Sequence, residues 1–299
     1  MKKTFKIILL TAIVMGCTVG SVMAQVLFTQ ADKDVYNKVM EVLAPLKDEA
    51  MSVRIMAAAK AMVGTPYVAG TLEQEPEELT VSLGKTDCIL LVEACACMAQ
   101  TAGQEDRSFE AFCENLRQFR YRNGITDGYA SRIHYTSEWI ARAQARGLLS
   151  EVTGEISQMP LDQTFSYMSK NADKYPALVK NPGLVPEIIA TEKNLSSASY
   201  FYIPKSQLES KLDQIRHGDM ICFVTNIEGL DITHVAWAYE TYECEHDCCP
   251  DARGCSNGQR RLGFLHASSS AGKVQVDPLT LVGYVNNIKS CIGVRIVRF

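Results

Sequence analysis

The sequence predicts an α+β fold, in which helices from the first half of the chain pack on one antiparallel sheet formed by the second half. Apolar residues recur three and four positions apart between residues 30 and 146, which is the period of amphipathic helices. From residue 219 onward the pattern changes to short apolar runs bounded by turn residues, which is typical of strands. The 299 residues are 47% apolar and 21% charged, as in ordinary globular proteins.

Helices are predicted, in chain order, at residues 30–64 (two stretches), 88–103, 109–121 and 139–146. The third stretch is apolar on most faces, so it should be buried, and Gly103 closes it. Residues 160–218 hold several prolines between short apolar runs, and we interpret them as a linker-like region with small helices.

Strands are predicted at residues 219–224, 234–239, 261–268, 273–277 and 292–299. The helical half contains Cys88 and the sheet half contains His234 and His266, which are the candidate functional residues discussed below. We therefore interpret residues 25–299 as one interdependent domain.

The first 24 residues are interpreted as a signal peptide. A basic start precedes an apolar run, Ile7 to Met15, that is too short to span about 30 Å of hydrocarbon, and small residues place cleavage after Ala24. The alternative is a lipoprotein signal, with Cys17 carrying the lipid. Both interpretations predict export to a bacterial periplasm, and no later run is long enough for a transmembrane segment.

The charge balance argues against nucleic-acid binding. The chain has 30 basic and 34 acidic residues, a formal net charge of −4, and removing the leader removes three lysines and no acid. The mature chain is therefore acidic and has no basic field to attract DNA or an anionic membrane.

Cys88 is the candidate nucleophile. It stands in the first turn of a predicted helix, after Thr86 and Asp87, either of which is a natural N-cap. The positive end of the helix dipole favours a thiolate at this place, and the thiolate is the reactive form. The alternative is a structural role, since other cysteines in apolar surroundings are expected to be buried: Cys95, Cys97, Cys113, Cys222 and Cys291.

Two histidines are suited to act with this cysteine. His234 begins an apolar strand and could serve as general base and then as general acid. His266 lies near the end of the next predicted strand, where antiparallel pairing would bring it beside His234 to orient that ring. A single histidine on a strand is more often structural, but the three residues in this order form a more specific signal.

Five short motifs follow one another along the chain: Gly64-Thr65-Pro66-Tyr67, Thr86-Asp87-Cys88, Gly218-Asp219-Met220-Ile221, Thr233-His234-Val235-Ala236 and His266-Ala267-Ser268. From about Gly64 onward the chain resembles the NlpC-type, papain-like superfamily of cell-wall amidases. The resemblance implies a papain-like fold, with Cys88 as nucleophile, His234 as base and His266 as the third, polar residue.

The chain departs from the common pattern in two ways. Ile89 and Leu90 follow the nucleophile where Ser-Gly is usual, and the spacing from Cys88 to His234 is long. The block from Tyr129 to Thr136 is similar to the exported N-acetylmuramoyl-L-alanine amidase-like branch. That resemblance implies cleavage between the lactyl group of N-acetylmuramic acid and L-alanine in (anhydro)muropeptides. The alternative is an endopeptidase that cuts the D-Glu–diaminopimelate bond.

Five side chains are expected to contact the substrate: Tyr67, Asp87, Glu93, Arg132 and Tyr135. The resemblance implies that Tyr67 lines the cleft. Arg132 could fork onto a carboxylate or lactyl oxygen, and Tyr135 could stack on a sugar. Glu93 should face the cleft or pair with a base such as Arg132. The alternative for Arg132 and Tyr135 is that they only hold a long loop against the core.

A cysteine-rich loop insertion is predicted at about residues 241–260, between the strands that carry the two histidines. Its cysteines are Cys244, Cys248, Cys249 and Cys255. The spacing is not the paired C-x2-C form of zinc sites, and export favours disulfides, with reduced cysteines or a metal as alternatives. None of these states would make the cluster catalytic.

The amidase interpretation needs no metal and no organic cofactor, and we expect a monomer that acts on peptidoglycan fragments. A metal-dependent hydrolase built on the cysteine cluster is a rival enzyme class. A binding module that kept only the papain-like shell is the non-enzyme alternative. It predicts the loss of Cys88, His234 or His266, and all three are present.

Overall fold

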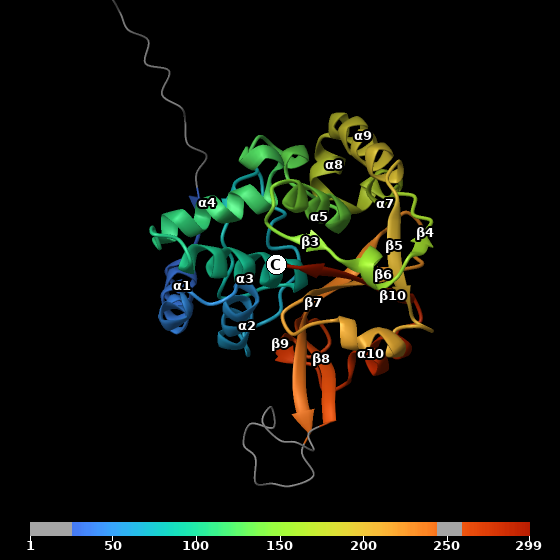
Figure 1. Cartoon of the computed structure of the whole chain (residues 1–299). Coiled ribbons are helices and arrows are strands. Elements are labelled where there is room, and N and C mark those ends of the chain that lie inside the picture. The colour runs from blue at the N-terminus through green and yellow to red at the C-terminus, as the bar shows by residue number, and fades with distance from the viewer. Residues whose placement is uncertain (1–25, 244–258) are drawn as a thin grey trace, which may run out of the picture.

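The α+β prediction is confirmed by a computed structural model, which describes residues 26–243 and 259–299 (Figure 1). The predicted leader, Cys17 and the cluster from Cys244 to Cys255 lie outside the described residues. No helix in the described part of the chain is long and apolar enough to cross a membrane. The narrower prediction of a papain-like, NlpC-type fold stays a prediction.

The helices are α1 (Gln30–Leu43), α2 (Met51–Ala61), α3 (Cys88–Ala102), α4 (Phe109–Arg120), α5 (Thr136–Ala145), α6 (Thr153–Ile156), α7 (Tyr167–Lys170), α8 (Pro176–Lys180), α9 (Val185–Ser196) and α10 (Leu281–Asn287). The strands are β1 (Val26–Leu27), β2 (Leu79–Thr80), β3 (Ser150–Glu151), β4 (Met159–Leu161), β5 (Tyr200–Pro204), β6 (Met220–Thr225), β7 (Ile232–Glu243), β8 (Gln259–Ser268), β9 (Lys273–Val276) and β10 (Cys291–Arg298).

One antiparallel sheet of eight strands forms the centre of the described structure. Its strands follow the order β4-β5-β10-β6-β7-β8-β9, with β3 paired to β10, and all of these pairs are antiparallel. The strands β7 and β8 pair to their ends, where Glu243 lies opposite Gln259. The predicted hairpin that carries both histidines is therefore confirmed.

Two apolar layers cover the two faces of this sheet. Strand β6 is buried along its whole length, and its alternate residues face opposite sides. Met220 and Cys222 belong to the core shared with α1 to α4, whereas Ile221 and Phe223 belong to a second core under α10. In Figure 1, α1 to α4 form one group in blue to green, and α10 lies apart from them.

Helix α3 joins the helical layer to the sheet because its sequence buries nearly every side chain. It packs between α2 and α4 and rests on β7 and β8. Five cysteines predicted to be buried are buried: Cys95, Cys97, Cys113, Cys222 and Cys291. This packing holds the first turn of α3 against the strand that carries His234.

The linker-like interpretation of residues 160–218 is wrong in part. This segment contains the twelve-residue helix α9, and its strand β5 pairs with β10 inside the sheet. Its prolines are compatible with regular structure because Pro176 and Pro186 occupy first-turn helix positions, which need no N–H donor. Pro204 ends β5.

Gly293 explains how β5 and β10 come together. A Cβ atom at Gly293 would collide with the carbonyl oxygen of Ile203 and press on the ring of Tyr202. Glycine is required here by close backbone approach, and its place coincides with an irregularity in the pairing of β10 with β6.

Candidate active site

The first turn of α3 presents Cys88. Asp87 is the N-cap, and its Oδ1 accepts a hydrogen bond from the Leu90 N–H at 3.0 Å. Cys88 is partly buried, and its sulfur lies beside the backbone N–H of Val235, the residue after His234 on β7. The helix start and the strand thus meet at the candidate nucleophile.

The two histidines form a hydrogen-bonded pair behind this cysteine. His234 Nε2 lies 2.7 Å from His266 Nδ1, with the rings nearly perpendicular at 82°. His266 is only 2% exposed, and its Nε2 lies 3.1 Å from Asp277 Oδ2. The N–H direction at His266 Nε2 does not point at this Asp277 oxygen well enough for a regular hydrogen bond. Such poor alignment is common for catalytic groups in structures without substrate.

Burial holds Cys88 and His234 in their neutral forms. It raises the pKa of Cys88 to about 12, and the neighbouring Asp87 carboxylate adds to this effect. It lowers the pKa of His234 to about 3. The thiolate expected from the helix dipole is therefore not the resting form, because desolvation outweighs the dipole. A nucleophilic role for Cys88 would therefore require a base that takes the thiol proton as the new bond forms.

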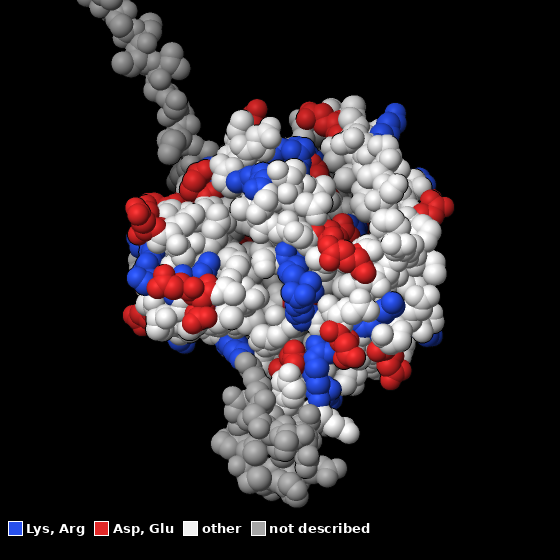
Figure 2. All heavy atoms as spheres, viewed as in Figure 1, with Lys and Arg blue, Asp and Glu red and all other residues white. Residues whose placement is uncertain are grey.

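A pocket of about 310 Å³ lies over Cys88 and His234. Besides these two residues, its walls come from the loop before β2, from α3 and α4, from residues 129–139, from α7 and from the start of β7. Arg120, Arg132, Glu73 and Glu93 all reach the pocket, so the lining carries both signs of charge. The outer face in Figure 2 likewise mixes acidic and basic side chains.

Two buried ion-pair groups flank the pocket. Glu93 pairs with Arg120 at 2.8 Å, and both side chains are 4% exposed. Arg132 contacts Glu73 at 2.9 Å and Glu77 at 3.1 Å. Glu93 thus lines the pocket and pairs with a basic residue, which is Arg120 and not Arg132, because the end of α4 packs beside α3.

The block from Tyr129 to Thr136 forms one pocket wall. The Arg132 guanidinium lies 5.0 Å from the centre of the Tyr129 ring. His134 Nε2 lies 3.0 Å from the Tyr129 carbonyl oxygen, and burial lowers the pKa of His134 to about 3. Tyr135 donates its hydroxyl proton to Glu192 Oε1 at 2.7 Å and accepts from Met168 N–H at 3.0 Å.

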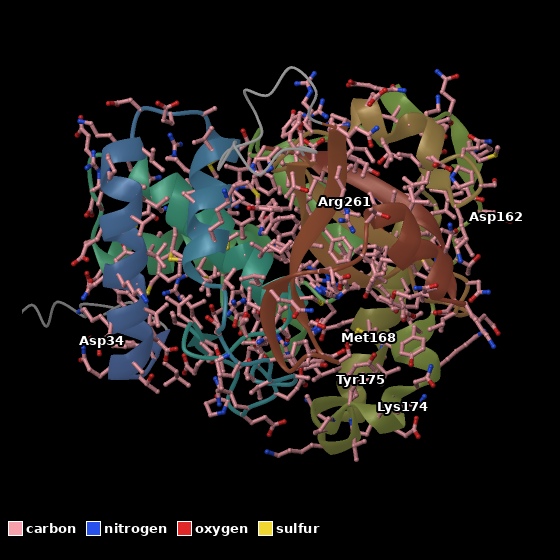
Figure 3. The ribbon with its side chains drawn as sticks, turned by 90° about the horizontal axis from the view of Figure 1, so that it is seen from below. Asp34, Asp162, Met168, Lys174, Tyr175 and Arg261 are labelled. Atoms are coloured by element: carbon pink, nitrogen blue, oxygen red, sulfur yellow. The ribbon has the colours of Figure 1, made fainter. Side chains whose placement is uncertain are left out.

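The segment α7 to α9 completes this wall. A separate hydrophobic cluster joins its side chains, among them Met168, to Tyr129 and Tyr135. Met168 and Tyr175 line the pocket, and Figure 3 shows them in the same part of the molecule. The long spacing between Cys88 and His234 is thus filled in part by a helical segment that shapes the pocket.

The predicted site residues divide into two groups. The pocket lining includes Cys88, His234, Glu93, Arg132 and Tyr135. It does not include His266, Tyr67 or Asp87. His266 lies behind His234 and is hydrogen-bonded to it, and Asp87 is the N-cap of α3. Burial raises the pKa of the Tyr67 phenol, and the nearby Cys88 and Asp87 add to this effect when they are charged.

Sequence reasoning missed Asp277, Arg120, Met168 and Tyr175. No local pattern marks Met168 or Tyr175, because their place depends on the packing of α7 and α8. A signal for Asp277 existed: it directly follows β9, the neighbour of the strand that carries His266. Within the described residues, no group of three or more His, Cys, Asp or Glu side chains is arranged to hold a metal ion.

The chain is similar to a known family and to solved structures. Residues 57–294 match the family described as AmiA-like, N-acetylmuramoyl-L-alanine amidase-like. A solved N-acetylmuramoyl-L-alanine amidase from Bacteroides uniformis ATCC 8492 is 32% identical, with a TM-score of 0.73, and the match covers 83% of this chain and 98% of that chain. A Bacteroides fragilis structure with a provisional xylanase name is 36% identical, with a TM-score of 0.71, covering 81% and 99%.

A Legionella pneumophila protein of the DUF1460 family shares the fold at 21% identity, with a TM-score of 0.60 over 90% of this chain and 95% of that chain. No curated protein matches the chain. Because the family match spans most of the sequence and the Bacteroides uniformis amidase aligns over nearly its whole length, the chain belongs to the N-acetylmuramoyl-L-alanine amidase-like family of hydrolases.

Proposed function

We propose that this protein is a cysteine amidase that hydrolyses the amide between the lactyl group of N-acetylmuramic acid and L-alanine in peptidoglycan fragments. The observation that carries the proposal is the meeting of Cys88 and His234 in one pocket, with His266 hydrogen-bonded behind His234. The family match and the amidase from Bacteroides uniformis support the choice of bond.

The proposed reaction is acyl transfer through a thioester. The Cys88 sulfur attacks the lactyl carbonyl carbon while His234 takes the thiol proton. First-turn N–H groups of α3, which have no partner within the helix, stabilise the oxyanion. His234 then gives the proton to the alanine nitrogen as the C–N bond breaks. Water, deprotonated by His234, hydrolyses the thioester and releases the sugar acid.

The pocket lining suits a substrate with hydroxyls, amides and carboxylates. Arg132 keeps Glu77 as a partner, whose side chain is 4% exposed, so a substrate carboxylate can replace the more exposed Glu73. Met168 and Tyr175 narrow the approach from the side of α7. We therefore propose that the substrates are soluble muropeptides, including the anhydro forms. We also propose that the protein is exported and acts in the periplasm.

The test is mass spectrometry of a disaccharide-tetrapeptide muropeptide after incubation with the mature protein. We expect free disaccharide and intact tetrapeptide from the wild type and from Cys291→Ala, a control that removes a buried cysteine outside the pocket. We expect neither product from Cys88→Ala.

Other products would contradict parts of the proposal separately. A disaccharide-dipeptide with a released dipeptide would replace the amidase by the endopeptidase. Full activity of Cys88→Ala would remove the cysteine mechanism. Loss of activity in EDTA, restored by a divalent metal, would point to the rival metal-dependent hydrolase.

A further inference from the structure

Asp277 contacts the buried histidine of the pair from the side away from the pocket. Its side chain is 9% exposed, and Oδ2 lies 3.1 Å from His266 Nε2. The other oxygen, Oδ1, accepts a hydrogen bond from the Leu279 N–H at 2.9 Å. The Asp277 N–H donates to the Phe264 carbonyl oxygen at 2.9 Å. The carboxylate is thus held in one orientation, with one oxygen for the backbone and one for the imidazole.

This arrangement determines which ring nitrogens carry protons. A carboxylate only accepts hydrogen bonds, so Asp277, 3.1 Å from His266 Nε2, favours a proton on that nitrogen and a lone pair on Nδ1, although the two groups are not aligned in a regular hydrogen bond. That lone pair accepts the proton of His234 Nε2, 2.7 Å away. A neutral imidazole has a single N–H, so His234 Nδ1 is left with the lone pair.

Both rings are neutral at rest, which makes this assignment consistent. Burial lowers the pKa of His234 to about 3 and lowers the pKa of His266, although Asp277 opposes the shift at His266. Besides Cys88, the titratable side chain of Tyr284 on α10 faces both rings, with ring centres 6.4 Å from His234 and 6.0 Å from His266. Burial, and after it the charge of Asp277, raises the pKa of Tyr284 to about 12, so it stays neutral.

We propose that Asp277 is a positioning residue that acts through His266 to keep His234 Nδ1 unprotonated and ready for the Cys88 proton. The inference rests on the proposed cysteine mechanism. As the S–C bond forms, the thiol proton moves to His234 Nδ1, and the ring becomes an imidazolium. The Asp277 charge, relayed through His266, stabilises this cation. The same proton then leaves with the amine nitrogen, and no proton is transferred to Asp277.

Asparagine at this position gives a sharp test because it has the same shape but one acceptor oxygen. When that oxygen serves the Leu279 N–H, the amide NH₂ faces His266 Nε2. The proton of His266 must then sit on Nδ1, which forces the proton of His234 onto its Nδ1. The base is blocked. Alanine at 277 imposes neither arrangement.

We therefore expect Asp277→Asn to be more damaging to kcat than Asp277→Ala, although it is the gentler change in shape. The loss for alanine should be about 10- to 100-fold, the range that is typical when a group that orients a metal-binding histidine is removed. The loss for asparagine should exceed it and stay below the roughly 10⁴-fold seen when a carboxylate touching the base itself is replaced. KM should change little in both variants.

The control is Asp219→Asn, which changes another buried aspartate with a backbone and a side-chain partner: it accepts the Arg216 N–H at 2.8 Å and pairs with Arg298 at 2.7 Å. It should keep the wild-type kcat. Thermal unfolding should rank Asp277→Asn above Asp277→Ala in Tm. If kcat follows Tm instead, so that asparagine is the milder change, Asp277 has only a structural role and the inference fails.

A second measurement does not depend on any substrate. Nitrogen-15 NMR of labelled histidines reports which ring nitrogen is protonated, and we expect an unprotonated Nδ1 at His234 in the wild type and a protonated one in Asp277→Asn. A protonated His234 Nδ1 in the wild type would overturn the inference. Wild-type protein with the expected tautomer but no cleavage of any muropeptide would instead overturn the proposed function alone.

Discussion

The buried ion pair between Glu93 and Arg120 gives the sharpest stability prediction. Both side chains are 4% exposed, with a nitrogen–oxygen distance of 2.8 Å. The two single substitutions should differ because the remaining charges differ. In Glu93→Leu the guanidinium of Arg120 stays charged, since arginine does not lose its proton in proteins. We expect a loss of about 3–5 kcal/mol in the free energy of unfolding.

In Arg120→Met the remaining carboxyl can take up a proton, because burial already raises the pKa of Glu93 while Arg120 lowers it. The loss should therefore be smaller and should shrink as the pH falls, by up to about 1.4 kcal/mol per pH unit. The double variant Glu93→Leu/Arg120→Met leaves no unpaired charge and should lie near the wild type or above it in stability.

Urea unfolding of the four proteins at pH 7 and pH 5 measures these differences as a double-mutant cycle. Additive effects of the two substitutions, or a cost below about 1 kcal/mol for Glu93→Leu, would refute the account. The stable double variant also tests the role of the Glu93–Arg120 pair in substrate binding, because both residues line the pocket. A raised KM in this folded protein would support that role.

Three further predictions concern other parts of the chain. His134 and His234 have pKa values of about 3 when folded and near 6.5 when unfolded, so the unfolded chain alone takes up their protons in between. The contribution of these histidines to stability is full above pH 6.5, and it falls by about 1.4 kcal/mol per pH unit for each histidine as the pH drops toward 3. In His134→Gln, the free energy of unfolding measured in urea should therefore fall less steeply with pH, by about 1.4 kcal/mol per pH unit. A pH dependence equal to that of the wild type would count against a buried neutral His134. Tyr135→Phe removes the hydroxyl that joins Glu192 to the Met168 N–H; Glu192 keeps the Ser169 N–H, whereas the buried Met168 N–H loses its partner. This change should cost about 1–3 kcal/mol, with faster proteolysis within residues 167–196, whereas protection equal to wild type would contradict the anchoring role. Gly293→Ala should cost at least about 1–3 kcal/mol in thermal unfolding, while Gly84→Ala, where the added atom meets only ordinary contacts, should cost less; equal effects would disprove the close approach.

The sequence predicts those parts of the fold whose signal is local. The cap at Asp87, the apolar run of α3 and the stop at Gly103 lie within one stretch, so the helix and the position of Cys88 could be predicted. The paired strands β7 and β8 carry alternating patterns that place His234 and His266 together. Strand β5 could not be found in this way, because its pairing with β10 joins segments about ninety residues apart.

The parts of the site that sequence missed depend on packing between distant elements. Arg120 reaches Glu93 because α4 packs along α3, and nothing in the sequence ranks it above Arg132 as the partner. The protonation state of Cys88 is a balance between the helix dipole and burial, and only the structure supplies the burial. Asp277 enters the site through the pairing of β8 with β9 and through the turn to Leu279.

The position of β10 has a consequence for synthesis. Residues 291–298 are translated after every other strand, yet they lie between β5 and β6 in the sheet. A nascent chain that ends before residue 291 cannot join those two strands, however long it waits on the ribosome. Without β10 the sheet consists of two separate parts, β4-β5 and β6-β7-β8-β9. The described sheet is therefore completed only when this last strand joins its two parts.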